Sequence, residues 1–382
     1  MSSPVIYSAI GILGGGQLGK MLAQAGADWN LNLQVLDPSA ECPASCCAHQ
    51  ITGDFRDYES VVAFGRDKQL ITIEIEDVNL EALQLLADQG VEVYPSPSSL
   101  EIIQDKGKQK LFYKEHGFPT SDFALVETGQ ALDGLLQQKI WNYPFVQKLR
   151  KAGYDGRGVQ ILNNSLDRNN WFEHPSIIEE RINIDKEIAV LVARNKQGEV
   201  TSYDPVEMVF HPVANLLLYQ ECPANISSSL SEQARHLAEN LISALNVVGL
   251  LAVEFFIDHS GRLLINEVAP RPHNSGHHTI EASMTSQFQQ HWRCILGLPL
   301  GSTESRDCSI LLNLLGEPGF MGPARYEGMA DCLSLSGVFI HLYGKKETKP
   351  FRKMGHITLL GQDPVRLREL AEEVKNKLKV IS

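Results

Sequence analysis

The chain has 382 residues, which is too long for one compact core, so we expect two or three domains. Hydrophobic residues make up 43% and charged residues 21% of the sequence, a composition that excludes collagen-like, coiled-coil and disordered proteins. The 34 basic and 46 acidic residues leave a net charge of −12, which argues against nucleic acid and anionic membranes as partners and requires a local basic cluster for any anionic ligand.

The first hundred residues are predicted to form a parallel sheet. An apolar strand at 10–13 is followed by three glycines and then by apolar residues at helical spacing. Further buried strands are expected at 33–36 and 70–75, and a helix at 80–87 follows the second of them. Strands that alternate with helices predict an α/β fold. The Pro- and Ser-rich segment at 94–99 is typical of a domain boundary and marks the end of a first domain, 1–100.

The remainder of the chain has α+β character and is expected to form two further domains, 101–300 and 301–382. The elements predicted for the central domain are helices at 101–116 and 231–247 and strands at 145–148, 188–193 and 251–257. The elements predicted for the last domain are strands at 338–343 and 355–360 and a closing amphipathic helix at 364–378.

The glycine-rich turn after the first strand has the spacing of a dinucleotide-binding fingerprint. Gly14, Gly16 and Gly19 lie between a strand and a helix, and Asp37 ends the next strand, where an acid that binds a ribose would lie. The same turn can receive another phosphate ligand at the helix N-terminus, or it can be a purely structural tight turn. The glycines alone leave these three interpretations open, and Gln17 adds a polar amide to the same crevice.

Residues 148–158 join a strand lysine to a loop that contains three glycines and several cations. The backbone amides of such a loop can approach a polyphosphate closely, and the cations offset its charge. The Gly-Lys-Ser/Thr ending of a Walker loop is absent from this segment. We therefore interpret it as a lid over a polyphosphate, with a solvated hairpin turn as the alternative.

Two acidic residues interrupt a predicted apolar hairpin at 251–267. A two-residue turn at Ser260-Gly261 places Glu254 directly opposite Glu267, and any other even-length loop leaves both on one face. Like charges opposed across strands are destabilising unless a cation lies between them. Carboxylates with the amide of Asn266 beside them are ligands that suit magnesium bound with nucleotide phosphates, and a solvated acidic sheet face is the alternative.

A polar run at 269–282 follows this hairpin. Its prolines fix the backbone, and it supplies donors for a small anion at Arg271, His273, Asn274 and Ser275. A zinc site formed by the histidines of the run is the alternative, but a helical i, i+4 pair with a carboxylate is not evident.

A basic cluster near the end of the chain contains five cations within nine residues: Lys345, Lys346, Lys349, Arg352 and Lys353. Such a run is usually a solvated surface. In an acidic chain it is also a candidate for the local anion site that the net charge requires.

The expected compartment is the cytosol. No stretch reaches the roughly 18 apolar residues that a bilayer span needs, and the first residues lack a basic leader. The seven cysteines are thinly spread, which predicts reduced thiols, and the cluster of Cys42, Cys46 and Cys47 has no matching second pair for a zinc site.

Taken together, these motifs resemble the ATP-grasp superfamily, and within it the 5-(carboxyamino)imidazole ribonucleotide synthases of bacterial and fungal purine biosynthesis. The resemblance covers nearly the whole chain, and its most specific part is the run at 266–279. The other segments that carry it are 14–19, 104–105, 153–156, 185–187 and 352–356.

The resemblance implies a homodimeric enzyme that uses ATP and Mg²⁺ to join bicarbonate to the amine of 5-aminoimidazole ribonucleotide. It implies an N-terminal Rossmann-like domain, a central ATP-grasp domain and a small C-terminal α+β domain. Transfer of the γ-phosphate to bicarbonate would give carboxyphosphate, and the amine would attack that species or the CO₂ released from it.

The resemblance also assigns roles to single residues. Lys106 and Lys148 would hold ATP phosphates, and Glu187 would bind the ribose hydroxyls. Magnesium would be held by Glu254 and Glu267. The other positions assigned to ATP are Gly153, Tyr154, Asp155, Gly156, Arg157, Gly158, Val159, Glu179, Glu180, Arg181, Ile182, His211, Asn266 and again Glu267. The positions assigned to the ribonucleotide are Gln17, Tyr154, Asp155, Arg157, Lys345, Arg352 and Lys353, and those assigned to catalysis near bicarbonate are Arg271, His273, Asn274 and Lys353.

Three positions depart from the family pattern. Lys106 stands where Arg is common, Leu149 where Thr is common, and Ile75 where an aromatic residue is common. A lysine keeps the charge of arginine but loses its bidentate fork.

Other functions are also compatible with parts of the sequence. Another ATP-grasp ligase, such as a formate-dependent glycinamide ribonucleotide transformylase or a biotin carboxylase, is the enzymatic alternative. An NAD-dependent dehydrogenase would use the first glycines but would leave the paired acids unexplained. A catalytically silent nucleotide-binding regulator is disfavoured because the paired acids, the lid glycines and the basic groups are all present.

Overall fold

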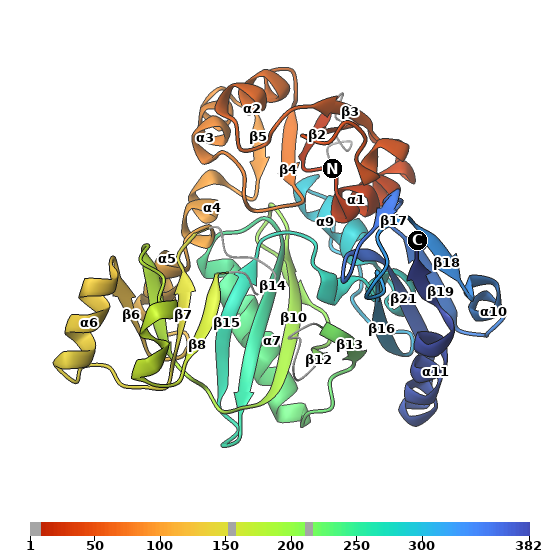
Figure 1. Ribbon diagram of the computed structural model, residues 1–382. Helices are drawn as coiled ribbons and strands as arrows, with labels where there is room; N and C mark the ends of the chain where they lie inside the picture. Colours follow the sequence, from red (N-terminus) through yellow and green to blue (C-terminus); the bar gives the residue numbers. More distant parts are fainter. Residues whose placement is uncertain (1–8, 152–157, 211–216) are drawn as a thin grey trace.

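The computed structural model describes residues 9–151, 158–210 and 217–382. An N-terminal α/β domain, a small antiparallel sheet and a C-terminal domain surround one large central sheet (Figure 1). No helix in these three ranges is both long and apolar enough to cross a membrane.

The N-terminal domain contains the predicted parallel sheet, with strand order β3-β2-β1-β4-β5. Its strands are β1 (Ile10–Leu13), β2 (Leu33–Asp37), β3 (His49–Thr52), β4 (Leu70–Ile73) and β5 (Glu92–Tyr94). Its helices are α1 (Gln17–Ala27), α2 (Tyr58–Gly65), α3 (Leu80–Asp88) and the 3₁₀ helix η1 (Pro43–Cys46). Strand β4 ends two residues earlier than predicted, because Glu74 leaves the sheet and turns its carboxylate towards the glycine-rich turn.

The single helix predicted at 101–116 is wrong, because two helices occupy this segment: α4 (Pro97–Ile103) and α5 (Lys106–Glu115). Asp105 has an extended backbone between them, and its side chain accepts hydrogen bonds from the N–H groups of Gly107 and Lys108. Aspartate is a favoured N-cap residue, so the chain starts a new helix at this position.

The small antiparallel sheet has the order β6-β9-β7-β8 and lies to one side of the central sheet (Figure 1). It comprises β6 (Phe123–Val126), β7 (Phe145–Leu149), β8 (Val159–Leu162) and β9 (Ser176–Glu180), with helices α6 (Gly129–Gln137) and η2 (Ser165–Asn170). The glycine-rich segment predicted as a lid connects β7 to β8.

The central sheet has the order β15-β14-β10-β12-β13-β16-β21-β19, with β11 paired to β10. Its strands are β10 (Ile184–Arg194), β11 (Val200–Ser202), β12 (Val206–Phe210), β13 (Leu217–Cys222), β14 (Gly249–Asp258), β15 (Leu263–Ala269), β16 (Cys308–Leu315), β19 (Val338–Leu342) and β21 (Lys353–Gly361). Because β13 pairs with β16, this sheet continues across the domain boundary expected near residue 300.

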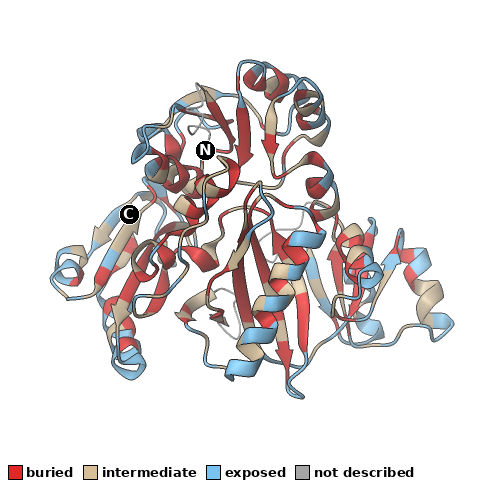
Figure 2. Ribbon diagram, turned by 180° about the vertical axis from the view of Figure 1, so that it is seen from behind, coloured by how far each residue is buried: buried red, intermediate tan, exposed pale blue. Residues whose placement is uncertain are grey.

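Helices cover the central sheet and its C-terminal continuation. These helices are α7 (Ser228–Ala244), η3 (Asn274–Gly276), α8 (Thr279–Ala282), α9 (Gln287–Ile295), α10 (Met329–Leu333) and α11 (Pro364–Lys377). Helix α7 lies across the back of the sheet, and Figure 2 shows exposed residues, in pale blue, along the outer face of this helix. It ends three residues before the predicted 247, and Asn246 beyond it has a left-handed backbone with φ 50°. The remaining short strands pair as β17 (Gly322–Pro323) with β20 (Glu347–Thr348) and β18 (Arg325–Glu327) with β22 (Lys379–Ile381).

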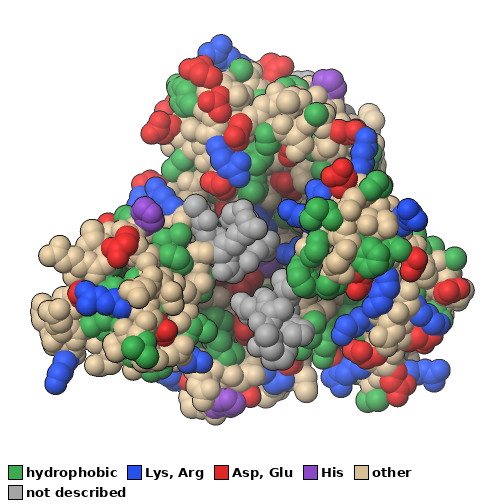
Figure 3. Space-filling model, in the orientation of Figure 1, with side chains coloured by type: hydrophobic (Ala, Val, Ile, Leu, Met, Phe, Trp, Pro, Cys, Tyr) green, Lys and Arg blue, Asp and Glu red, His purple; other side chains and the backbone are tan. Residues whose placement is uncertain are grey.

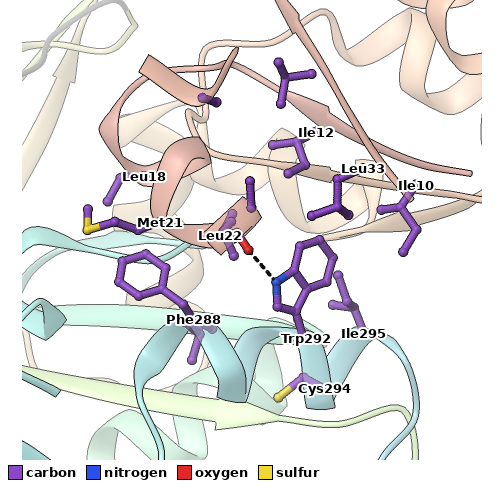
Figure 4. Packing of buried hydrophobic residues seen from close by; sticks show 14 of the residues in the cluster. Ile10, Ile12, Leu18, Met21, Leu22, Leu33, Phe288, Trp292, Cys294 and Ile295 are labelled. Atoms are coloured by element: carbon purple, nitrogen blue, oxygen red, sulfur yellow. Dashed lines mark hydrogen bonds between the residues drawn. The ribbon is translucent and has the colours of Figure 1, made fainter. Parts of the chain in front are cut away.

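One hydrophobic cluster joins the N-terminal domain to the central sheet. Trp292 of α9 is fully buried and donates a hydrogen bond from its indole Nε1 to the carbonyl oxygen of Leu22 in α1, at 2.8 Å (Figure 4). The side chains of Met21 and Phe288 belong to the same cluster. The glycine-rich turn that begins α1 is therefore fixed relative to the central sheet.

Candidate active site

Glu254 on β14 and Glu267 on β15 lie directly opposite each other, as predicted. The even-length loop that the prediction assumed is wrong. Near the turn Ile257 pairs with Leu263, which shifts the register by one residue from that of a two-residue loop. A β-bulge between Glu254 and the next residue shifts the register back, so the two carboxylates meet.

The environment of this carboxylate pair favours a bound cation. Burial, Glu267 and Glu187 together raise the pKa of Glu254 to about 8. Burial is the main reason that the pKa of Glu187 is raised, to about 7, and Glu267 acts in the same direction. Burial also disfavours the charge of Glu267, but Lys106 and Lys148 hold the pKa of Glu267 below its usual value. The ammonium of Lys106 pairs directly with Glu267 and acts as a stand-in cation.

Oxygen donors on these two strands fit Mg²⁺ in chemical type. Within the described ranges, no group of three or more His, Cys, Asp or Glu side chains is arranged so that it could hold a metal ion by itself. Glu254 and Glu267 would therefore hold magnesium only together with oxygens of the nucleotide. The amide oxygen of Asn266 accepts a hydrogen bond from Lys148 Nζ at 2.9 Å, so Asn266 contacts a predicted phosphate-binding lysine.

Lys148 belongs to a buried network of ion pairs. Its Nζ lies 3.1 Å from Glu179 Oε1, and Lys110 Nζ lies 3.1 Å from Glu179 Oε2. The hydroxyl of Ser121 also donates to Glu179, at 2.7 Å. Burial opposes the charge of Glu179, but the two lysines lower its pKa to about 2. Glu179, one of the positions assigned to ATP, therefore lies beside the lysine predicted to hold ATP phosphates.

Lys110 is a site residue that sequence reasoning missed. It follows Lys106 by four residues on α5, so the two side chains share one helix face. The i, i+4 spacing of Lys106 and Lys110 could have identified Lys110 from the sequence. Burial lowers the pKa of Lys110 to about 8, although Glu179 acts in the opposite direction.

The residues predicted to bind bicarbonate lie beside the carboxylate pair. His273 Nε2 is 3.5 Å from Glu254 Oε1, and its Nδ1 is 2.9 Å from the hydroxyl of Ser275. Burial and the neighbouring Arg271 lower the pKa of His273 to about 4, so its ring is neutral near pH 7. The amide of Asn274 makes a long contact of 3.4 Å with the amide oxygen of Asn313.

Arg271 is oriented by the N-terminal domain. Its Nη2 donates to Glu76 Oε1 at 3.1 Å, and Glu76 lies just after strand β4. Burial opposes the charge of Glu76, but the guanidinium holds the pKa of that carboxyl below its usual value. The ion pair therefore fixes one donor of the candidate bicarbonate site.

The glycine-rich turn is filled by carboxylates of the protein itself. Glu74 accepts hydrogen bonds from the N–H groups of Gly16 and Gly19, each at 2.7 Å, and Asp37 accepts one from Gly15 at 2.9 Å. A Cβ on Gly16 would lie 2.5 Å from Glu74 Oε1, so this glycine is needed for the close approach. These amides are used internally, which argues against a dinucleotide at the turn. Glu74 was not among the predicted site residues, although an acid directly after a buried strand could have indicated a role for it.

The predicted ribonucleotide residues come from two ends of the chain. Gln17 begins α1, and one turn later Lys20 Nζ donates to the carbonyl of Leu342 at 2.9 Å, which brings the segment before the basic cluster against α1. Within the cluster, Lys345 Nζ donates to the carbonyl of Lys353 at 2.7 Å. Figure 3 shows basic side chains bordering the centre of the molecule on the side of the C-terminal domain.

Other residues of the basic cluster have partners of their own. Arg352 Nη1 donates to the carbonyl of Glu347 at 2.7 Å, and Lys346 pairs with Glu41 of the N-terminal domain. The positive charge of Lys353 is one cause of the lowered pKa of His273. Lys353 is thus electrostatically coupled to the candidate bicarbonate site.

The remaining predicted ATP residues lie around the small sheet. The carbonyl of Gly158 accepts from Leu149 N at 2.8 Å, and Val159 pairs with Lys148 across β7 and β8. Glu180 ends β9, while Arg181 and Ile182 follow in the connection to β10. Several predicted site residues lie outside the described ranges: Gly153, Tyr154, Asp155, Gly156, Arg157 and His211.

Comparisons with protein families divide the chain into three matches. Residues 7–104 match the ribonucleotide synthetase preATP-grasp domain, and residues 111–288 match the ATP-grasp domain. Residues 309–370 match the phosphoribosylaminoimidazole carboxylase C-terminal domain.

Two relatives illustrate the similarity over the chain. An N5-carboxyaminoimidazole ribonucleotide synthase of Brucella melitensis is 39% identical, with 92% of this chain and 96% of that protein covered. A chloroplastic phosphoribosylaminoimidazole carboxylase of Vigna aconitifolia is 36% identical, with 92% of this chain covered. The chain spans only 64% of the length of that plant protein.

Solved structures show the same similarity in three dimensions. The N5-carboxyaminoimidazole ribonucleotide synthetase of Thermotoga maritima is 40% identical, with a TM-score of 0.89 and coverage of 98% of this chain and 99% of that chain. The N5-carboxyaminoimidazole synthase of Aspergillus clavatus, in complex with ADP and 5-aminoimidazole ribonucleotide, is 32% identical, with a TM-score of 0.84 and 96% coverage of both chains.

Proposed function

Because this chain belongs to the N5-carboxyaminoimidazole ribonucleotide synthase family of ATP-grasp enzymes, we propose that it carboxylates 5-aminoimidazole ribonucleotide with bicarbonate and ATP, in purine biosynthesis. The products are N5-carboxyaminoimidazole ribonucleotide, ADP and phosphate. The observation that carries the proposal is the opposed pair Glu254 and Glu267, which lies between the lysines of α5 and β7 and the polar run after β15.

The first half of the reaction is the transfer of the γ-phosphate from ATP to bicarbonate. Lys106 and Lys148 offset phosphate charge, and Glu187 on β10 binds the ribose hydroxyls. Magnesium bound by Glu254 and Glu267 would neutralise charge that develops on the transferred phosphoryl group. Entry of a triphosphate also provides Lys106 with an anionic partner other than Glu267. Residues 153–158 act as the lid that excludes water.

Bicarbonate is placed where the γ-phosphate can reach it. The charged donor is Arg271, which Glu76 orients, and the neutral donor is the ring of His273. Asn274 adds an amide to the same run. A neutral imidazole can donate one hydrogen bond to the bound anion without adding a second full positive charge. The carboxyphosphate so formed is held away from water until the amine attacks it or its CO₂.

The ribonucleotide occupies the space between the N-terminal and C-terminal domains. Gln17 contacts it from α1, and Lys345, Arg352 and Lys353 meet its phosphate. The chain carries a net charge of −12, so a dianionic phosphate needs such a local cluster. Tyr154, Asp155 and Arg157 are proposed to complete the site from the lid.

The proposal includes three further statements about the molecule. The domains are divided at residues 100 and 300, giving 1–100, 101–300 and 301–382. The enzyme acts in the cytoplasm as a homodimer, and analytical ultracentrifugation that gives a monomer mass would contradict the dimer.

Release of ADP tests the function directly. With MgATP present, ADP release should require both bicarbonate and 5-aminoimidazole ribonucleotide, and omission of either should remove most of it. Turnover with formate and glycinamide ribonucleotide instead would identify the transformylase alternative. Stabilisation against heat by NADH equal to that by MgATP would favour the dehydrogenase.

A further inference from the structure

Three buried or half-buried histidine rings form a stack between the central sheet and its C-terminal continuation. The ring centroids of His277 and His356 are 4.6 Å apart with an interplanar angle of 27°. Those of His356 and His341 are 4.5 Å apart with an angle of 12°. His277 follows η3, whereas His356 on β21 and His341 on β19 are register partners in adjacent strands.

One end of the stack is connected to the candidate bicarbonate site. His277 Nδ1 is 3.1 Å from Gln287 Nε2. The same buried glutamine accepts a hydrogen bond from the backbone N–H of His273 and donates one to the His273 carbonyl, each at 2.8 Å. Gln287 therefore clamps the backbone of His273 on both sides, and its amide is in contact with the first ring of the stack.

The middle ring belongs to the strand that begins with Lys353, and the far end contacts helix α8. His356 lies three residues after Lys353 on β21, and its Nδ1 is 3.1 Å from the hydroxyl of Tyr343. His341 Nε2 is 2.7 Å from Glu281 Oε1, and Glu281 lies in α8 at the end of the polar run. The stack thus touches both segments that carry the proposed catalytic groups.

A core that served packing alone would not favour imidazole here. His356 Nε2 and Glu281 Oε2 are buried and have no hydrogen-bond partner within the described ranges. Unpaired buried polar atoms destabilise a fold, so an apolar side chain at position 356 would serve stability better. Burial holds the pKa values of His277 and His356 well below normal, so these two rings are uncharged and can stack without repulsion.

We propose that His356 is a positioning residue: stacked between His277 and His341, it sets the spacing between the bicarbonate-binding run at His273 and the phosphate-binding strand at Lys353. This role rests on the proposed function. Flat rings define one separation between two backbones, whereas branched aliphatic chains can pack at several. A misplacement of about 1 Å between reacting groups can lower a rate about a hundred-fold.

Kinetics of His356→Leu and His356→Phe test the role. In His356→Leu, kcat/KM for bicarbonate and for the ribonucleotide should fall roughly ten- to hundred-fold, while the Kd for ATP stays within about two-fold. His356→Phe keeps a flat ring in the stack and should recover most of the lost rate. Unchanged constants in the leucine variant, or an equal loss in ATP affinity, would overturn the proposal.

A second variant covers the case in which position 356 does not tolerate leucine. The side chain of His341 is 29% exposed, and His341→Gln removes its ring from the stack while keeping a side-chain donor for Glu281, so this variant disturbs the stack with less risk to folding. It should show the same selective loss, and a parallel drop in all constants would overturn the positioning role. The wild-type assay is run first. A wild-type enzyme without bicarbonate-dependent ADP release would refute the proposed function and remove the premise of the positioning role, whereas an active wild type with unselective variants refutes the positioning role alone.

Discussion

Two carboxylates opposed across neighbouring strands, only one of which pairs directly with a lysine, are the arrangement on which the proposed magnesium site rests. Lys106 pairs with Glu267, so Glu254 bears most of the electrostatic cost of the arrangement. A divalent ion would let both acids ionise together. Lys106 also has a raised pKa: burial opposes its charge, but Glu267 more than compensates. It is therefore charged near neutral pH.

Glu267→Gln should abolish most turnover without unfolding the protein. The substitution removes one of two opposed like charges and one magnesium ligand but keeps the shape of the side chain. The thermal midpoint of the free enzyme should stay close to that of the wild type, because the loss of the Lys106 ion pair opposes the gain from reduced repulsion. Steady-state kcat and thermal unfolding are measured together, and near-normal kcat would reject the metal-binding role.

Glu254→Gln should change how stability depends on pH. With its pKa raised to about 8, folded Glu254 holds a proton between pH 4.5 and 8 where the unfolded chain does not. The unfolded state therefore binds fewer protons, and the wild type loses stability as pH rises through this window, by at most about 1.4 kcal/mol per unit. Urea unfolding at pH 6, 7 and 8, without ATP or magnesium, should show the variant gaining on the wild type. Parallel pH profiles for the two proteins would contradict the raised pKa.

Lys353→Ala should raise KM for the ribonucleotide roughly ten- to hundred-fold, because a charge-assisted contact contributes about 1.5–3 kcal/mol. KM for ATP should change little. The matched control is Lys349→Ala, an exposed lysine of the same cluster that should alter neither constant. An effect on ATP alone would mean that the two ligands lie on the opposite sides of the site.

Single functional residues could be predicted where a residue type was unusual for its local sequence. Glu254 and Glu267 stand out because acids are unusual in apolar strands, and they do meet. The bulge that brings them together was not predictable, since the odd loop and the bulge cancel each other. The carboxylate of Glu74 in the glycine turn was missed, because its partners lie 55 and 58 residues away.

Helix α5 shows how one element organises several lysines. Asp105 starts the helix by accepting two backbone N–H groups, and it also binds Arg150 at the end of β7, at 2.7 Å and 2.9 Å. The first turn of the helix is thereby tied to the strand that carries Lys148. Lys106 and Lys110 then point into the same buried network.

Lys110→Ala should raise KM for ATP and lower stability. Without Lys110, the buried carboxylate of Glu179 has one lysine left, Lys148, which it would draw away from the phosphates. Breaking a buried ion pair costs about 3–5 kcal/mol. Lys108→Ala on the same helix removes only an exposed pair with Glu101 and should cost less than about 1 kcal/mol. Equal effects of the two substitutions on urea unfolding and KM would show that the network has no special role.

Elements were predicted well where periodicity was regular and poorly where a cap interrupted it. The parallel strands of the first domain and the strands β7, β10 and β14 fall where their apolar patterns placed them. The prediction at 101–116 joined two helices into one, because it gave no weight to the break at Asp105. Aspartate is a favoured N-cap residue, so Asp105 could have indicated that a second helix starts here.

The whole molecule is held together by contacts that join residues far apart in the chain. The central sheet includes β16, β21 and β19 because β13 pairs with β16, and the hydrophobic cluster around Trp292 unites α1 with α9. Such pairings link residues separated by about 90 to 270 positions, and apolar periodicity carries no information on partners at that distance. The resemblance to a family, not the local pattern, predicted the arrangement of the parts.

Trp292→Ala should destabilise the protein and weaken the ribonucleotide more than ATP. The indole is fully buried between the N-terminal domain and the central sheet, so its removal leaves a cavity and breaks the hydrogen bond to the Leu22 carbonyl, at a cost of about 3–5 kcal/mol. Helix α1 begins with Gln17 and carries Lys20, which contacts the strand before the basic cluster. Loosening α1 should therefore raise KM for the ribonucleotide. The ATP network on α5, β7 and β9 does not include α1, so KM for ATP should change less.

A comparison with Trp29→Ala separates this joint from a general effect of losing tryptophan. Trp29 lies just beyond the C-terminal end of α1 and is 37% exposed, so its loss should cost much less stability and leave both KM values unchanged. Trp292→Phe provides the intermediate case, because it fills most of the volume but cannot donate to Leu22. The free energy of unfolding in urea should decrease in the order wild type, Trp292→Phe, Trp292→Ala. Both KM values should increase in the same order, with the smaller increase for ATP. If Trp292→Ala instead raises both KM values equally, α1 does not position the ribonucleotide separately, and the N-terminal domain acts only as a support for the whole site.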